Sequence, residues 1–131
     1  MKKLFILSIL IFLGIFGSHA ETNIVKSNKV KTGIYKYSND INIEYVILED
    51  IDEAIIYSYR EQEDVDDRLN TKDTSATLEN ALTEFTKLNL NKFSKYKNYY
   101  NYKMLKRQLH YNVIINDTKY VIFEARILFL N

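Results

Sequence analysis

The chain has 131 residues, with 18 lysines and arginines against 17 aspartates and glutamates, and it contains neither cysteine nor proline. This length suits one domain with a single modest core. The absence of cysteine excludes disulfides, thiol catalysis and thiolate metal sites, and three glycines leave little material for a phosphate-binding loop.

The first twenty residues have the three-part layout of a cleavable secretory signal peptide. Two lysines precede an apolar stretch from Leu4 to Phe16, and the small residues that signal peptidase requires follow at Ser18 and Ala20. The apolar stretch is shorter than the roughly 20 residues of a membrane span, and an uncleaved N-terminal anchor is the alternative. We therefore expect a periplasmic or secreted protein that meets the membrane only during export, with a signal peptide at 1–20 and a single domain at 21–131.

Three short strands are expected before residue 61, because apolar and polar side chains alternate there with a period of two. The first strand covers 33–37 and follows a polar leader. The second begins at Ile41 and has one apolar face, and the third covers 54–60. Turns rich in Asn, Asp and Glu separate these strands.

One amphipathic helix is predicted from Ser75 to Tyr96, after an acidic connection at 61–73. Asp73, Thr74 and Ser75 offer oxygens for capping its N-terminus. Large apolar side chains recur on a single stripe at the helical period, namely Leu78, Leu82, Phe85, Phe93 and Tyr96.

Two long strands are expected to close the chain around a hairpin turn at 116–119. Arg107 is expected at the rim of the sheet and His110 on the polar face of the first of these strands. In the second, Glu124 and Arg126 oppose apolar positions that run from Val121 to Phe129. The apolar face of the first is predicted to hold Leu105, Leu109, Tyr111, Val113 and Ile115.

The whole pattern predicts an α+β fold. The elements follow the order β-β-β-α-β-β, which suits an antiparallel sheet of about five strands with the amphipathic helix packed on one face. The segments IDEAIIYSYRE, TLENALTEFTKLNL and NVIINDTKYVIFEARILFL give the chain an order and texture that resemble the PsbP/DcrB/Mog1-like small domains. The resemblance covers about residues 41–130, and it implies a non-catalytic accessory domain that binds a protein partner.

Charge is divided unevenly along the chain. Residues 40–79 carry thirteen acids and three bases, whereas residues 85–131 carry nine bases and two acids. This division predicts that the two segments face one another or form opposed surface patches. The frequent Asn, Lys, Ile and Tyr are typical of an AT-rich genome and, together with the signal peptide, indicate a low-GC bacterium.

The acidic connection at 61–73 contains Asp64, Asp66 and Asp67. Clustered carboxylates are typical of solvated turns, and calcium binding is the alternative, although the central glycine and terminal glutamate of an EF-hand are missing. Paired carboxylates would also suit an exported hydrolase acting on cell-wall glycans. Serine-hydrolase and zinc-protease motifs are absent from the sequence, so enzymatic activity is not favoured, and we predict neither a cofactor nor a metal site.

Tyrosines alternate with lysines at 95–103. Such a segment can stack on nucleic-acid bases, but an exported protein meets little nucleic acid, and we expect none as a partner. Exposed tyrosines are typical of protein-recognition surfaces, and the alternative is that they cover the end of the sheet. The binding candidates are Tyr99, Tyr100, Tyr102, Lys97, Lys103, Asp64, Asp66 and Asp67.

These observations favour a small exported protein that binds another protein in the bacterial envelope. An immunity or inhibitor protein is one specific form of this function, because strong local charge suits fast capture of a partner. Two alternatives remain open: the carboxylate-dependent hydrolase, and a carrier that holds a small apolar ligand between helix and sheet.

Overall fold

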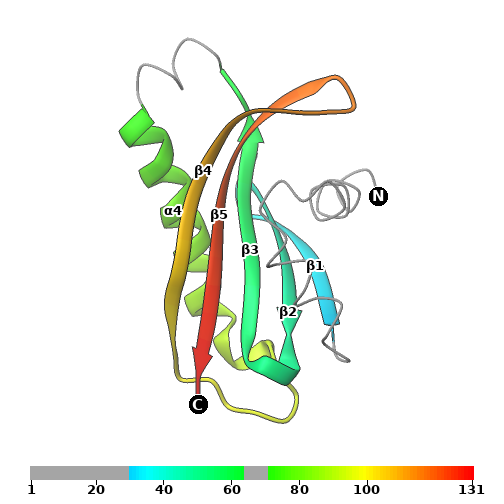
Figure 1. The fold of residues 1–131 in the computed structure, drawn as a ribbon, viewed down its shortest axis with the longest axis vertical. Helices are drawn as coiled ribbons and strands as arrows, with labels where there is room; N and C mark the ends of the chain where they lie inside the picture. Colours follow the sequence, from blue (N-terminus) through cyan, green and yellow to red (C-terminus); the bar gives the residue numbers. More distant parts are fainter. Residues whose placement is uncertain (1–29, 64–70) are drawn as a thin grey trace.

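The computed structural model describes residues 30–63 and 71–131. In these two ranges, five antiparallel strands form one sheet, and an α-helix packs against it (Figure 1). The predicted α+β class and the predicted chain order of the elements are confirmed. The predicted signal peptide lies outside the described residues, as do Asp64, Asp66 and Asp67.

The spatial order of the strands differs from their order in the chain. The final strand pairs with the third, so the sheet order is β1-β2-β3-β5-β4, and β1 and β4 form its edges (Figure 1). The five strands are β1 (Val30–Lys36), β2 (Asn42–Leu48), β3 (Glu53–Glu61), β4 (Asn101–Ile115) and β5 (Thr118–Leu130).

The helix α4 spans Thr71–Leu88 and is therefore shorter at its C-terminal end than the predicted Ser75–Tyr96. It ends because Asn89 leaves the helical conformation, and its side-chain amide donates to the carbonyl of Phe85 at 2.8 Å. Asparagine competes in this way for backbone hydrogen bonds. A 3₁₀ turn, η2 (Leu90–Lys92), then brings Phe93 into the core, whereas Tyr96 is 79% exposed and does not continue the helical stripe.

One face of the sheet, here called the helix face, packs against α4. Leu78, Leu82 and Phe85 of the helix are buried there. The predicted alternation of β5 is confirmed, because the helix face also holds Val121, Phe123, Ala125, Ile127 and Phe129. Burial of these side chains provides the main hydrophobic stabilisation of the described fold.

The opposite face of the sheet, here called the far face, is also buried. Among the described residues, its hydrophobic cluster comes from strands alone and comprises Val46, Leu48, Ile55, Tyr57, Tyr59, Val113, Ile115 and Ile122. The prediction of one apolar face for the second strand was therefore incomplete. Strands buried on both faces have nearly continuous apolar sequences, as in the segment from Tyr45 to Leu48.

Two bulges break the alternation of β4. The pairing with β5 shifts between Met104 and Lys106 and again between His110 and Val113. Met104 therefore packs toward the helix-face cluster, whereas Leu105 is exposed. The second bulge turns the strand over, so the prediction of a single face was wrong: Leu109 and Tyr111 lie on the helix face, and Val113 and Ile115 on the far face.

The second bulge is held by Asn112, which adopts a left-handed conformation with φ of 57°. Its backbone N–H donates to Oε1 of Gln62 at 2.6 Å, and Nε2 of Gln62 donates to Oδ1 of Asn112 at 3.0 Å. Gln62 directly follows β3, so this reciprocal pair joins the bulge to the end of the central strand. The predicted hairpin turn is confirmed next to it, with positive φ angles at Asn116 and Asp117.

Replacing Asn112 by alanine is expected to lower the free energy of unfolding by about 1–2 kcal/mol. Alanine is sterically disfavoured in the left-handed conformation, and it also lacks the side-chain oxygen that accepts the hydrogen bond. Asn112→Gly is the matched control, since glycine adopts this backbone freely. Urea unfolding should place the glycine variant between the wild type and Asn112→Ala. An alanine variant as stable as the glycine variant would show that the bulge geometry is not required.

Candidate functional site

The loop from Phe93 to Tyr100 is anchored to the turn between β2 and β3. That turn consists of η1 (Glu49–Ile51) and Asp52, whose φ of 55° is left-handed. Oδ1 of Asp52 accepts hydrogen bonds from Lys97 Nζ at 2.7 Å and from the Tyr99 hydroxyl at 2.9 Å. The ion pair is partly exposed and contributes little to stability by itself. Its main effect, with the Tyr99 bond, is to fix the loop on the turn.

The candidate tyrosines have different surroundings. Tyr99 is 4% exposed and stacks on Phe129 with ring centroids 4.5 Å apart. Burial, and then the hydrogen bond to Asp52, raises its pKa well above the ordinary tyrosine value. Tyr102 is partly buried and packs against the helix-face cluster, whereas Tyr100 is 71% exposed. Of the alternatives left open by the sequence, Tyr99 and Tyr102 therefore cover the end of the sheet, and Tyr100 is on the surface.

Exposed apolar side chains gather at the end of the molecule that carries this loop. The described residues include eight exposed large hydrophobic side chains, and four lie at this end. We call this group of side chains, together with a neighbouring lysine, the loop end; the backbone segments that carry them lie at the bottom of Figure 1. It comprises Ile51, Leu88, Lys95, Tyr96 and Tyr100. Sequence reasoning missed Tyr96, because its spacing also fits the helical stripe.

The predicted apposition of the acidic and basic segments is seen in three ion pairs between them. Arg126 and Glu53 approach to 2.6 Å on neighbouring strands, and Arg107 reaches from the edge strand to Glu79 on α4 at 3.3 Å, as expected for a residue at the rim. The pair of Lys97 with Asp52 is the third. Part of the charge asymmetry of the sequence is thus neutralised within the fold. Lys95 and Lys103 are exposed.

A row of buried polar groups crosses the far face. Glu44, Tyr57 and Glu124 are direct neighbours on β2, β3 and β5. The Tyr59 hydroxyl donates to Glu44, and His110 Nε2 lies 3.5 Å from Glu124 Oε1. The side chain of His110 is only 12% exposed, so the predicted polar face of this strand is not a solvent-exposed face at His110.

Burial and these carboxylates also raise the pKa values of Tyr57 and Tyr59. Desolvation, followed by the charges of Glu124 and Glu44, raises the pKa of Tyr57 far above its ordinary value. Desolvation and the hydrogen bond to Glu44 do the same to the pKa of Tyr59. Both phenols therefore remain protonated in the folded protein at any physiological pH.

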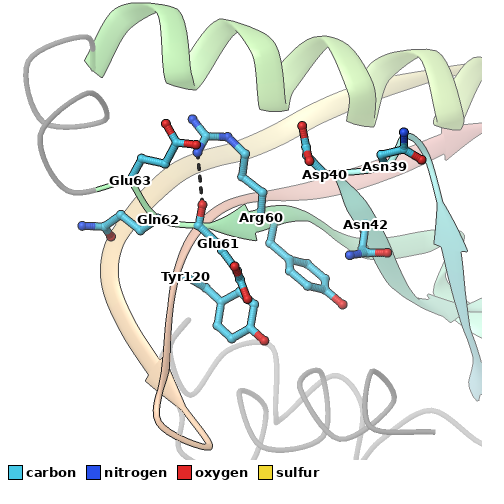
Figure 2. Close-up of a pocket in the computed structure, with 9 residues that line it drawn as sticks. Asn39, Asp40, Asn42, Arg60, Glu61, Gln62, Glu63 and Tyr120 are labelled. Carbon is cyan, nitrogen blue, oxygen red and sulfur yellow. Dashed lines mark hydrogen bonds between the residues drawn. The ribbon is translucent and has the colours of Figure 1, made fainter.

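A notch of about 680 Å³ lies at the opposite end of β3 from the loop end (Figure 2). It forms because β3 extends past the end of its pairing with β2. The last pair between these two strands joins Asn42 to Tyr59, whereas β3 continues to pair with β5 as far as Glu61. Its described lining is Asn39, Asp40, Asn42, Tyr59, Arg60, Glu61, Gln62, Glu63 and Tyr120. The strand β3 has nine residues, and a strand rises about 3.3 Å per residue. Its two ends, and with them the notch and the loop end, are therefore about 26 Å apart.

The predicted site residues therefore do not form one site. Lys97, Tyr99, Tyr100, Tyr102 and Lys103 lie at or near the loop end. The acidic candidates belong to the connection that follows Glu63, beyond the described residues. In the described ranges, no three metal-ligating side chains are arranged to hold an ion, and no helix is long and apolar enough to cross a membrane. The calcium alternative for 61–73 concerns a segment whose residues 64–70 lie outside the described ranges.

No protein-family model, no curated protein sequence and no solved structure matches this chain. The likeness to the PsbP/DcrB/Mog1-like domains, which rests on the order of elements, accordingly stays a prediction.

Proposed function

We propose that this chain is a small non-enzymatic protein that is exported into the bacterial envelope and binds another protein there through the loop end. An immunity or inhibitor protein is the specific form that suits its size and its local charge. The export step rests on the signal peptide expected at 1–20, and the resemblance noted above implies a protein partner as well.

The observation that carries the proposal is the exposure of two tyrosines on an anchored loop. Tyr96 and Tyr100 are both more than two-thirds exposed, and they flank the residues that Asp52 holds in place. Tyrosine supplies a large, rigid and amphipathic contact area, and it is enriched where proteins recognise each other. A loop that is already ordered loses less conformational entropy on binding, which favours affinity.

The helix–sheet interior supports this function over that of a carrier. The large side chains of Leu78, Leu82 and Phe85 fill the space between α4 and the strands, and all are nearly fully buried. A carrier would need this volume for its ligand. Of the far-face carboxylates, Glu44 accepts a hydrogen bond from the Tyr59 hydroxyl, as a buried structural group does.

The double variant Tyr96→Ala/Tyr100→Ala is expected to reduce capture of the partner from envelope extract at least about tenfold. This corresponds to about 1.4 kcal/mol, a modest loss for two aromatic contact residues. Quantitative mass spectrometry of proteins retained by the immobilised wild type and variant, at low and at moderate salt, provides the measurement.

Ile114→Ala is the matched control, because Ile114 is also a large apolar residue, 65% exposed, but lies beside the β4–β5 turn at the other end of the sheet. It should retain the partner as the wild type does. Equal retention by the double variant, with an unchanged circular dichroism spectrum, would exclude the loop end. Failure of the wild type to retain any protein would contradict the proposed function itself.

A further inference from the structure

The strand β4 has one edge that pairs with no other strand in the described ranges. It is the last strand in the sheet order β1-β2-β3-β5-β4, and its other edge pairs with β5. Every second residue of an antiparallel edge strand turns its backbone N–H and C=O away from the sheet. The bulges interrupt β4, but residues 106–110 between them pair regularly with β5. This stretch, here called the open edge, therefore offers a template for a further strand.

The helix α4 extends past the open edge and forms a groove with it. In Figure 1 the N-terminal half of α4 lies outside the line of β4. The groove between the two elements measures about 580 Å³, and it is lined by Lys72, Ser75, Ala76, Glu79 and Asn80 of one helix stripe and by Leu109 of β4. A strand added to β4 would lie about 4.8 Å beyond it. Its helix-face side chains would then contact Ala76 and Leu109.

The charge along β4 is of one sign. The strand contains Lys103, Lys106 and Arg107 but neither aspartate nor glutamate. Arg107 is paired with α4, whereas Lys103 and Lys106 are exposed and make no ion pair with any described residue. Both lysines stand opposite far-face positions of β5, Leu128 and Arg126. An added strand would therefore meet unneutralised positive charge on its far-face side, which favours acidic side chains there.

The two sides of an added strand thus meet different surroundings. Its side chains alternate between the faces of the sheet, so one set would face the groove beside α4 and the other set the two lysines. A second copy of β4 does not suit this position, because it would bring lysines of like charge together. We propose that the open edge binds, by strand addition, an extended segment of another protein in which apolar and acidic residues alternate. This surface is additional to the loop end and contains none of its tyrosines.

Short synthetic peptides test the open edge directly. A peptide of alternating glutamate and valine is titrated into isotopically labelled protein, and the shifts of backbone amide resonances are followed. Saturable shifts are expected at residues 106–110 and, across the groove, at Ala76 and Asn80. A peptide of alternating lysine and valine should bind at least about fivefold more weakly. The variant Lys103→Glu/Lys106→Glu should reverse this preference, because acidic side chains then meet like charge.

Methylation of the peptide nitrogens separates strand pairing from simple charge attraction. Methyl groups on every second amide block one edge of the peptide and leave its other edge intact. Of the two complementary methylation patterns on the glutamate peptide, one should abolish binding, and the other should keep the affinity within about twofold. Equal binding by the two methylated peptides would contradict strand addition.

Lys31→Glu/Lys36→Glu on β1 is the matched control, because it reverses two exposed charges on the opposite edge of the sheet. Four strand spacings, about 19 Å, separate the two edges, which exceeds the Debye length of about 8 Å in physiological salt. The affinity of this control for the glutamate peptide should stay within about twofold of the wild type.

Retention of wild-type affinity by a folded Lys103→Glu/Lys106→Glu variant would overturn the proposal. Shifts centred on β1 or on the loop end would do the same, as would the absence of saturation with the glutamate peptide up to about 10 mM. None of these variants alters the loop end, so the outcomes leave the proposed protein-binding function to its own test.

Discussion

The protein is expected to lose stability above pH 10, by about 2 kcal/mol from pH 10 to 11 and by nearly 3 kcal/mol for each pH unit above that. The cause is the pair of buried far-face phenols, Tyr57 and Tyr59, whose pKa values burial raises well above the ordinary value of 10.0. In the unfolded chain both phenols ionise from about pH 10 upward, whereas the folded chain retains their protons. The unfolded state then binds fewer protons than the folded state, so the free energy of unfolding falls as pH rises, by about 1.4 kcal/mol per unit for each group.

Urea unfolding at pH 8, 10 and 11 measures this loss. The variant Tyr57→Phe separates it from the titration of lysines, which ionise in the same range. Between pH 10 and 11 the variant should lose about 1 kcal/mol less than the wild type, because the phenol is only half ionised in the unfolded chain at pH 10. Parallel stability curves for the two proteins would mean that Tyr57 ionises without unfolding and that the far face is open to solvent.

Replacing Tyr99 by alanine is expected to lower the free energy of unfolding by about 3–5 kcal/mol, the range for truncation of a buried aromatic residue. Its ring stacks on Phe129, and its hydroxyl donates to Asp52. The neighbouring Tyr100→Ala is the matched control and should change stability by no more than about 0.5 kcal/mol, because that side chain is exposed.

The two variants can be compared by urea denaturation monitored by circular dichroism. A third variant, Tyr99→Phe, keeps the stacking and removes only the hydrogen bond. Its free energy of unfolding should fall by about 1 kcal/mol. Similar losses for Tyr99→Ala and Tyr100→Ala would contradict the assignment of one tyrosine to the core and the other to the surface.

Much of the fold follows from side-chain periodicity. Alternation in β5 correctly predicted which of its residues share a face, because this strand pairs regularly with β3 from Glu53 to Glu61. The turn at 116–119 was predicted from residues that tolerate positive φ. The class of the fold followed from the order of these elements.

Periodicity failed where a single residue interrupts it. Asn89 ends the helix, although the apolar stripe continues to Phe93 and Tyr96. Asn112 adopts a left-handed conformation and turns β4 over, which moves Val113 to the other face of the sheet. Neither effect changes the pattern of apolar residues, and both depend on hydrogen bonds of asparagine side chains. The pairing of β5 with β3 could not be predicted either, because it joins segments that are far apart in the sequence, whereas alternation describes only neighbouring residues.

The same limits applied to the candidate site. The segment 95–103 was predicted to be either a surface for partner contact or a cover for the sheet; Tyr99 and Tyr102 pack against the helix-face cluster, whereas Tyr100 is exposed. Two long-range contacts distinguish the buried ring of Tyr99 from its exposed neighbours: the hydrogen bond to Asp52, 47 positions earlier, and the stacking on Phe129. The notch had no signal in the sequence, because it depends on where β2 stops pairing with β3.

The most direct test of the account is to map where a captured partner contacts the protein. Labelled protein titrated with the purified partner should show its largest amide shifts at the loop end, around Ile51, Lys95, Tyr96 and Tyr100, and little change at Ile114 or in the notch. Shifts centred on the notch or on the β4–β5 turn would contradict the claim that the exposed tyrosines of the anchored loop form the binding surface.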